Sequence, residues 1–276
     1  MSLEESVHVY ESLLGKAYAA ICLIDGTSEQ PLAVPLELHD LQARTPDSAH
    51  NPLPLPQVVG KTGLFGFYYP DDLALYAPLA PAEALDAPSS HQAAELSGTL
   101  VDPGRRYNPT AFTISLSAVT TGFVPAEIKV FRTPFGTPVT CTGAVCGNLR
   151  YDQPSPPPPV PFARVTLTFS VTRRLSDPPR TIIVAAETDP AGDFVLPLDR
   201  LPALTGSETS RRGKLTVRVP ARGAAPAASG AATLHDATIG AAGSGTTAAQ
   251  ILLDVRPGAV LRVPALPAKH LVAVPT

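Results

Sequence analysis

The chain has 276 residues, of which 44% are hydrophobic and only 16% are charged, and its formal net charge is −3. This balance supplies enough apolar residues for a core and argues against a protein built around a large basic surface for nucleic acid. The 32 prolines disfavour a helical enzyme and favour a loop-rich, all-β chain, because proline breaks helices and is confined to the ends and edges of strands.

The first ten residues, "MSLEESVHVY", are acidic and lack the apolar stretch of a secretory signal. We therefore expect cytoplasmic synthesis without a signal peptide, followed by retention there or by release as part of a particle. Residues 1–16 combine the spacing of a helix capping box with strand-like alternation, which predicts a short helix or an extended arm. The following run, "AYAAICLI", is too short to span a bilayer, so no membrane insertion is expected.

From residue 17 onward, alternating apolar residues separated by turn residues predict β-strands. Over 17–136 we expect strands within "AYAAICLID", "VPLELHDL", "VVGKTGLFGFYY", "GTLVD", "AFTISLSAV" and "AEIKVFRT". Segments 44–57 and 77–95 are rich in proline or alanine and predict long surface loops. Residues 17–136 are therefore predicted to form a first β-sandwich domain, with residues 1–16 as an arm.

Residues 138–276 predict a second β-sandwich domain. Its strands are expected within "VTCTGAVCGNLRYD", "FARVTLTFSVTRR", "TIIVAAETD", "GDFVLPLD", "GKLTVRVPA", "QILLDV", "AVLRVPAL" and "HLVAV", with a polyproline-like "PSPPPPVP" between the first two. Residues 223–249 consist mainly of Gly, Ala, Ser and Thr. We expect there either a flexible loop or backbone packed closely against some other part of the structure.

Both halves contain a turn with a glycine that is followed two residues later by phenylalanine. Gly63 and Phe65 in the first half correspond to Gly192 and Phe194 in the second. The glycine is expected to supply a positive φ, and the phenylalanine to be the first inward side chain of the next strand. Asp189 is placed to cap the second turn. These five residues are interpreted as structural turn residues and not as a cation site.

The stretch "GAVCGNLRYDQ…PVPFARVTLTF…AETDPAGDFVLPL" resembles the carboxypeptidase regulatory-like, transthyretin-related β-sandwich. The resemblance covers roughly residues 140–220 and is carried by Pro161, Ala163, Val165, Thr188, Asp189, Gly192 and Phe194. The first half resembles it weakly, through Pro31, Pro35, Thr62, Gly63 and Phe65. The resemblance implies two tandem immunoglobulin- or transthyretin-like sandwiches with long Pro/Ala/Gly-rich loops. It also implies a non-catalytic role, because such modules mostly act as appendages.

The glycine-rich segment 240–247, "GAAGSGTT", has the glycine spacing of a phosphate-binding loop. Thr246 stands where such a loop needs a lysine to clamp the phosphates. Asp71 and Asp72 are interpreted as turn caps, since paired catalytic acids come from separate strands facing a cleft. Neither segment is expected to bind a cofactor or to catalyse a reaction.

Two His-Asp pairs occur, His39-Asp40 and His235-Asp236. Adjacent residues on a strand point to opposite faces, so neither pair is expected to grip one metal ion. Cys141 and Cys146 leave a hairpin disulfide open as an alternative to free thiols, whereas a zinc site lacks the further ligands it needs. We therefore expect no catalytic, cofactor or metal site, and no enzyme.

Two segments carry side chains suited to protein contacts, "FGFYY" and "DPGRRYNPTAF". The candidate interface residues are Tyr68, Tyr69, Arg105, Arg106 and Tyr107. The second segment also resembles accessory proteins of phage-tail-like contractile particles.

The absence of a defensible active site, the extracellular type of module without an export signal, and the long segments that need a partner to become ordered all favour a structural role. The hypothesis is a non-catalytic structural, adaptor or decoration subunit of a large assembly, such as a virion or a contractile injection particle, whose partners are other protein subunits. The alternative is a module that binds a carbohydrate or cell-surface glycan, which expects exposed aromatic side chains along one sheet or loop end.

Overall fold

The computed structural model describes residues 19–44, 57–61, 63–68, 94–116, 125–139, 142–172, 178–204, 208–222, 227–264 and 268–276. Within these residues all regular structure is β, with seventeen strands and no helix, which confirms the all-β expectation. The arm predicted over 1–16 lies outside the described residues, as does most of the loop predicted over 77–95.

The chain divides into two compact units. The first unit contains Met1–Ile24, Pro31–Val101 and Ala111–Lys129, and the second contains Asp25–Gln30, Asp102–Thr110 and Val130–Thr276. The second unit thus includes two short segments from the first half of the sequence, and these segments contribute residues to the candidate site described below.

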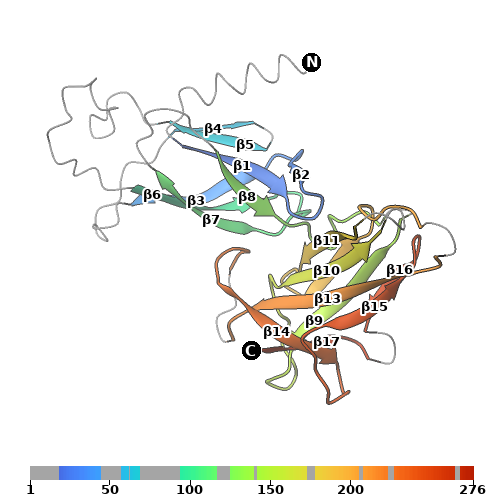
Figure 1. Cartoon of the computed structure of the whole chain (residues 1–276). Helices are drawn as coiled ribbons and strands as arrows, with labels where there is room; N and C mark the ends of the chain where they lie inside the picture. Colours follow the sequence, from blue (N-terminus) through green and yellow to red (C-terminus); the bar gives the residue numbers. More distant parts are fainter. Residues whose placement is uncertain are drawn as a thin grey trace. The chain divides into compact units, whose positions relative to one another are not determined.

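The first unit contains two sheets in a sandwich-like arrangement (Figure 1). In the larger sheet the order is β2-β1-β5-β4, with β8 also paired to β1, and in the smaller sheet it is β3-β6-β7. Their bounds are Ala19–Asp25 (β1), Gln30–Pro31 (β2), Glu37–Arg44 (β3), Gln57–Lys61 (β4), Leu64–Tyr68 (β5), Ala94–Val101 (β6), Thr110–Leu116 (β7) and Ala126–Val130 (β8).

Alternating apolar residues build the core of the first unit, because successive strand side chains point to opposite faces. Ile21 pairs with Phe65 across β1 and β5, and both side chains are buried. Gly63 precedes β5 with a φ of 77°, and a Cβ there would lie 2.7 Å from the carbonyl oxygen of Leu32. Only glycine satisfies both conditions, so Gly63 fixes the point at which β5 begins.

The second unit is built on a nine-stranded sheet (Figure 1). Seven of its strands follow the order β11-β10-β13-β14-β17-β9-β12, and the other two pair beside them, β15 with β13 and β16 with β9. Its strands are Ala144–Tyr151 (β9), Arg164–Val171 (β10), Arg180–Glu187 (β11), Asp193–Pro197 (β12), Arg211–Pro220 (β13), Leu234–Ala241 (β14), Ile251–Val255 (β15), Val260–Val263 (β16) and Leu271–Pro275 (β17). Strand β14 joins two layers, because it pairs with β13 on one side and with β17 on the other.

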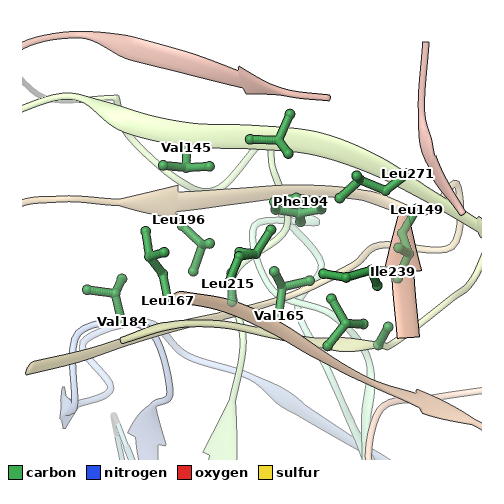
Figure 2. Close-up of a cluster of buried hydrophobic side chains, with 14 of the residues drawn as sticks. Val145, Leu149, Val165, Leu167, Val184, Phe194, Leu196, Leu215, Ile239 and Leu271 are labelled. Atoms are coloured by element: carbon green, nitrogen blue, oxygen red, sulfur yellow. The ribbon is translucent and has the colours of Figure 1, made fainter. Parts of the chain in front are cut away.

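The core of the second unit lies between these two layers. Figure 2 shows apolar side chains from both layers pointing into the shared interior, among them Val165 and Leu167 of β10 and Phe194 of β12. All three are at most 1% exposed. The clean alternation predicted in "FARVTLTF" is therefore the pattern of a strand with one face in the core.

The turn between β11 and β12 has the structure expected of its residues. The side-chain Oδ1 of Asp189 accepts hydrogen bonds from the backbone N–H of Ala191 at 2.8 Å and of Asp193 at 3.0 Å. Gly192 has a φ of 82°, and a Cβ there would collide with the carbonyl oxygen of Leu149. These contacts occupy Asp189 in holding the turn, in line with its interpretation as a turn cap.

Two strands were not expected from the sequence, the two-residue β2 and the longer β14. The segment 223–249 contains β14, which pairs with β13 and β17. Its buried side chains, Ala237 and Ile239, alternate correctly, but they are too few and too small to stand out among Gly, Ala and Thr. Close backbone packing also occurs within the segment itself, because a Cβ on Gly240 would collide with the carbonyl oxygen of Thr246.

Candidate interaction site

Two loops of the second unit, residues 102–107 and 132–137, are hydrogen-bonded to each other, and we call this pair the double turn. The backbone N–H of Thr133 donates to the carbonyl oxygen of Arg106 at 2.8 Å. The hydroxyl of Thr133 donates to the carbonyl oxygen of Arg105, also at 2.8 Å. Each loop therefore satisfies polar backbone groups of the other, which fixes their relative position.

Asp102 organises the first loop of the double turn. Its carboxylate accepts hydrogen bonds from the backbone N–H of Gly104 at 2.9 Å, and from the backbone N–H and the guanidinium of Arg106 at 2.8 and 3.1 Å. Burial by itself would raise the pKa of Asp102, but these hydrogen bonds and the charge of Arg106 outweigh it and lower the pKa below its usual value. Asp102 is therefore a buried carboxylate held in its charged form.

The second loop is fixed just as completely. The hydroxyl of Thr133 accepts a hydrogen bond from the N–H of Gly136 at 3.1 Å, and the hydroxyl of Thr137 donates to the carbonyl oxygen of Thr133 at 2.8 Å. Pro134 locks its own φ. A Cβ on Gly136 would collide with the carbonyl oxygen of Arg106. The backbone on both sides of Phe135 is therefore fixed, by the proline before it and by the glycine after it, which packs against the other loop.

Among the side chains that the double turn presents to solvent are one aromatic ring and two guanidinium groups. Phe135 is 82% exposed, the largest value among the large hydrophobic side chains that the structure describes as exposed. The Arg106 side chain is 45% exposed, whereas that of its partner Asp102 is 0% exposed. Arg105 is exposed and has a φ of 55°. This left-handed conformation costs a residue with a Cβ about 1–2 kcal/mol.

Arg132 of the double turn forms an ion pair with the buried carboxylate of Asp25. The carboxylate of Asp25 accepts a hydrogen bond from Nε of Arg132 at 2.6 Å and another from the hydroxyl of Tyr107 at 3.1 Å. Asp25 is 2% exposed and Tyr107 is 6% exposed. Burial, followed by the charge of Asp25, raises the pKa of the Tyr107 phenol. Both loops of the double turn are therefore anchored to one buried carboxylate through side chains.

A second buried polar cluster surrounds Glu187 at the end of β11. Its carboxylate accepts hydrogen bonds from the guanidinium of Arg164 at 3.3 Å and from the amide of Asn108 at 3.4 Å, and it is also hydrogen-bonded to the Ser229 side chain. The guanidinium of Arg164 lies 3.7 Å from the centroid of the Phe131 ring. Asn108 and Phe131 directly adjoin the double turn in sequence, so this cluster ties both loops to β10 and β11.

No protein-family model, curated protein or solved structure matches the chain. The resemblance to the carboxypeptidase regulatory-like module therefore stays a prediction, and a functional proposal has to rest on the residues of this chain. In the part of the chain that the structure describes, no helix has the length and apolar character needed to cross a membrane.

The candidate interface residues predicted from the sequence differ in their exposure, and not all of them are described by the structure. Arg105 and Arg106 lie exposed on the double turn. Tyr107, expected to be exposed, is instead buried against Asp25, and this expectation is corrected. Tyr68 is the last residue of β5, and the structure describes its backbone but not its side chain. Tyr69 lies outside the described residues.

Phe135 was missed by sequence reasoning, although a signal was present. It follows Pro134 and precedes Gly136, which is the composition of a tight turn. A large aromatic residue in a turn has no strand face to fill, so it is a candidate for exposure. The strand expected in "AEIKVFRT" ends at Thr133, and no role was assigned to the residues that follow it.

The His-Asp pairs do not form metal sites. His39 lies on β3 with its Nε2 3.2 Å from a carboxylate oxygen of Glu37, and both side chains are largely exposed. Asp236 on β14 forms an exposed ion pair with Arg218 at 3.3 Å. Among the described residues, no group of three or more His, Cys, Asp or Glu side chains is arranged to hold a metal ion.

The other segments considered for chemistry are the glycine-rich residues 240–247, the two neighbouring cysteines and the Asp71-Asp72 pair. In the segment 240–247, Gly243 and Gly245 take positive φ values of 80° and 66° in a turn, and the next regular element is strand β15. A phosphate-binding loop would lead into a helix. Cys146 is a free cysteine on β9, and Cys141 lies outside the described residues. Asp71 and Asp72 also lie outside them.

The setting of Glu187 predicts an unusual dependence of stability on pH. Burial raises its pKa above the usual 4.5, although the hydrogen bonds from Ser229, Arg164 and Asn108 act in the opposite direction. The folded chain therefore binds this proton at a higher pH than the unfolded chain does. The contribution of this group to the free energy of unfolding is fully present below pH 4.5 and is lost as the pH rises through the folded pKa.

We expect Glu187→Gln to abolish this dependence. Chemical denaturation at a series of pH values should show that the wild-type chain gains stability relative to Glu187→Gln as the pH falls toward 4.5. Glu95→Gln, which changes an exposed carboxylate on β6, is the control and should keep a constant difference from the wild type. A constant difference for Glu187→Gln as well would contradict the raised pKa.

Proposed function

We propose that the chain is a non-catalytic structural or adaptor subunit of a large protein assembly, a virion or a phage-tail-like contractile particle, and that the double turn is its contact with a neighbouring subunit. Its scaffold in this proposal is a pair of tandem immunoglobulin- or transthyretin-like sandwich domains, the second of the carboxypeptidase regulatory-like type. The observation that carries the proposal is Phe135, an aromatic side chain 82% exposed on a backbone that hydrogen bonds hold in place.

A single exposed hydrophobic side chain is ordinary on protein surfaces. Phe135 differs because its surroundings are built to hold it. Its loop is closed by Thr133 and Thr137, packed on Arg106 through Gly136, and anchored through Arg132 to buried Asp25. A rigid aromatic group loses little conformational entropy on binding, and buried aromatic and arginine side chains dominate the energy of protein interfaces.

The alternative of a glycan-binding module has less support in the described residues. That alternative expects exposed aromatic side chains along one sheet or loop end, and Phe135 is one such ring at a loop end. The exposed large hydrophobic side chains that lie on described strands are aliphatic, namely Val58, Ile183, Leu252 and Val260. The apolar face of a sugar ring stacks on aromatic side chains, and one ring with scattered aliphatic groups does not line a binding face, so we do not propose glycan binding.

The proposal is tested by isolating the tagged chain from its own host under mild conditions. The wild-type chain is expected to sediment with a regular megadalton particle that negative-stain imaging can show. Phe135→Ser should reduce the fraction bound to that particle at least tenfold, because loss of a central aromatic contact costs about 2 kcal/mol or more of binding free energy.

Leu252→Ser is the matched control, because Leu252 is 53% exposed on β15 of the same unit and lies outside the double turn. It should leave sedimentation with the particle unchanged. A wild-type chain that migrates alone, with its monomer mass of 28.7 kDa, would contradict the assembly function. Equal losses for the two serine variants would contradict the role of the double turn.

A further inference from the structure

We propose further that the surface which receives the double turn is an acidic protein surface, with an apolar pocket for Phe135 and carboxylates at its border that pair with Arg105 and Arg106. This inference rests on the proposed function and names the chemistry of the partner at the same site. The partner is a different protein subunit and not a second copy of this chain.

Arg105 is the strongest indication of this chemistry. Its backbone takes a left-handed conformation with a φ of 55°, which glycine adopts without strain and arginine does not. Its backbone groups serve the turn, since the N–H donates to the carbonyl oxygen of Asp102 and the carbonyl accepts from Thr133. Glycine would supply both backbone groups equally well. The arginine side chain therefore lowers the stability of the turn.

No described residue of the second unit compensates for that loss. Among the described residues, the guanidinium of Arg105 makes no hydrogen bond and no ion pair, and the residue is exposed. A residue that costs stability and has no side-chain partner among the residues described around it is typical of a functional position. The group that Arg105 offers to a partner is a planar cation, whose best match in a protein is a carboxylate bound through two hydrogen bonds.

Arg106 adds a second positive group to the same surface. Its partner Asp102 has a side chain 0% exposed, while the Arg106 side chain is 45% exposed, so the negative charge lies inside and the positive charge outside. The chain as a whole has a net charge of −3. Attraction to an acidic partner therefore has to be local, at the double turn, and it selects the orientation in which the partner docks.

Phe135 distinguishes a protein partner from other anions. It is 82% exposed on the loop that packs against Arg106. A free phosphate or a nucleic-acid backbone would satisfy the arginines but would leave this ring in water. An apolar pocket bordered by Asp or Glu satisfies the ring and the arginines together, which matches the usual division of an interface into an apolar centre and a polar rim.

The first test separates folding from binding at position 105. Arg105→Gly is expected to raise the midpoint of thermal unfolding by about 2 °C, because it relieves the left-handed arginine. The same substitution should weaken binding to the isolated particle at least about tenfold. Arg256→Gln, at an exposed arginine after β15, is the control and should change neither quantity. A glycine variant that binds as well as the wild type would overturn the proposal.

The second test identifies the partner group. In Arg105→Lys, the lysine keeps the positive charge and adds an amine that a carbodiimide can join to a nearby carboxylate as an amide. The variant bound to the particle should give a new cross-link, absent in the wild type, that peptide mapping assigns to an Asp or Glu of another subunit. Arg105→Glu should lose binding through like-charge repulsion.

Each remaining outcome has a definite meaning. A cross-link to a second copy of this chain, release of the chain by nuclease, or full binding by Arg105→Glu would each overturn the acidic partner and leave the assembly function standing. If the wild-type chain does not sediment with a particle at all, the proposed function fails first and this inference fails with it.

Discussion

Replacing Arg132 with methionine is expected to lower the free energy of unfolding of the second unit by about 3 kcal/mol. The reason is Asp25, which is 2% exposed and would lose the cation that lies 2.6 Å away. The loss of one partner of a buried ion pair is much more damaging than the loss of both. Urea unfolding followed by circular dichroism measures the change, since the chain contains no tryptophan.

Two variants make this prediction specific. Arg212→Met breaks the ion pair with Asp254, in which the side chains are 68% and 60% exposed, and should cost at most about 0.5 kcal/mol. Asp25→Asn combined with Arg132→Met should recover part of the stability, because no uncompensated charge is left. If Arg132→Met and Arg212→Met have equal effects, the Asp25 pair does not anchor the double turn.

Replacing Phe194 with alanine is expected to lower the free energy of unfolding by about 4 kcal/mol. Phe194 is 1% exposed within the core of the second unit, and its ring lies so close to the backbone of β9 that a Cβ on Gly147 would be 2.8 Å from it. Truncation removes the apolar ring and leaves a cavity, since the paired strands β9 and β12 cannot move together to fill it.

Phe135→Ala is the natural control, because it removes the same side chain from a position that is 82% exposed. It should change the free energy of unfolding by less than about 0.5 kcal/mol. Similar losses for the two alanine variants would show that the ring of Phe135 is buried in the folded chain. That result would contradict the exposed aromatic on which the proposed function depends.

The parts of the fold that the sequence predicts best are those decided by local chemistry. The alternation of Val165, Leu167 and Phe169 predicts a strand with one buried face, and β10 is that strand. The sequence around Asp189 and Gly192 predicts a turn, because an aspartate cap and a glycine with positive φ are local requirements. In these cases the residues that determine the structure are neighbours in the sequence.

The candidate site was harder to predict because distant residues build it. Tyr107 is buried and donates a hydrogen bond to Asp25, which lies 82 residues earlier in the chain. No local sequence pattern predicts such a distant partner. Strand β14 depends in the same way on β13 and β17, which supply the pairing that its small side chains do not specify. Arg105 and Arg106 were recognisable as exposed, but the rigid support that makes them significant was not.

The central claim is that the double turn touches another subunit, and a photo-cross-linker at position 135 tests it most directly. Benzoylphenylalanine in place of Phe135 keeps an aromatic group there and joins covalently to whatever lies against it. In the isolated particle we expect a cross-link from this position to a different protein subunit, while the same group in place of Leu252 gives none. A chain that remains in the particle without any cross-link from position 135 would contradict the claim.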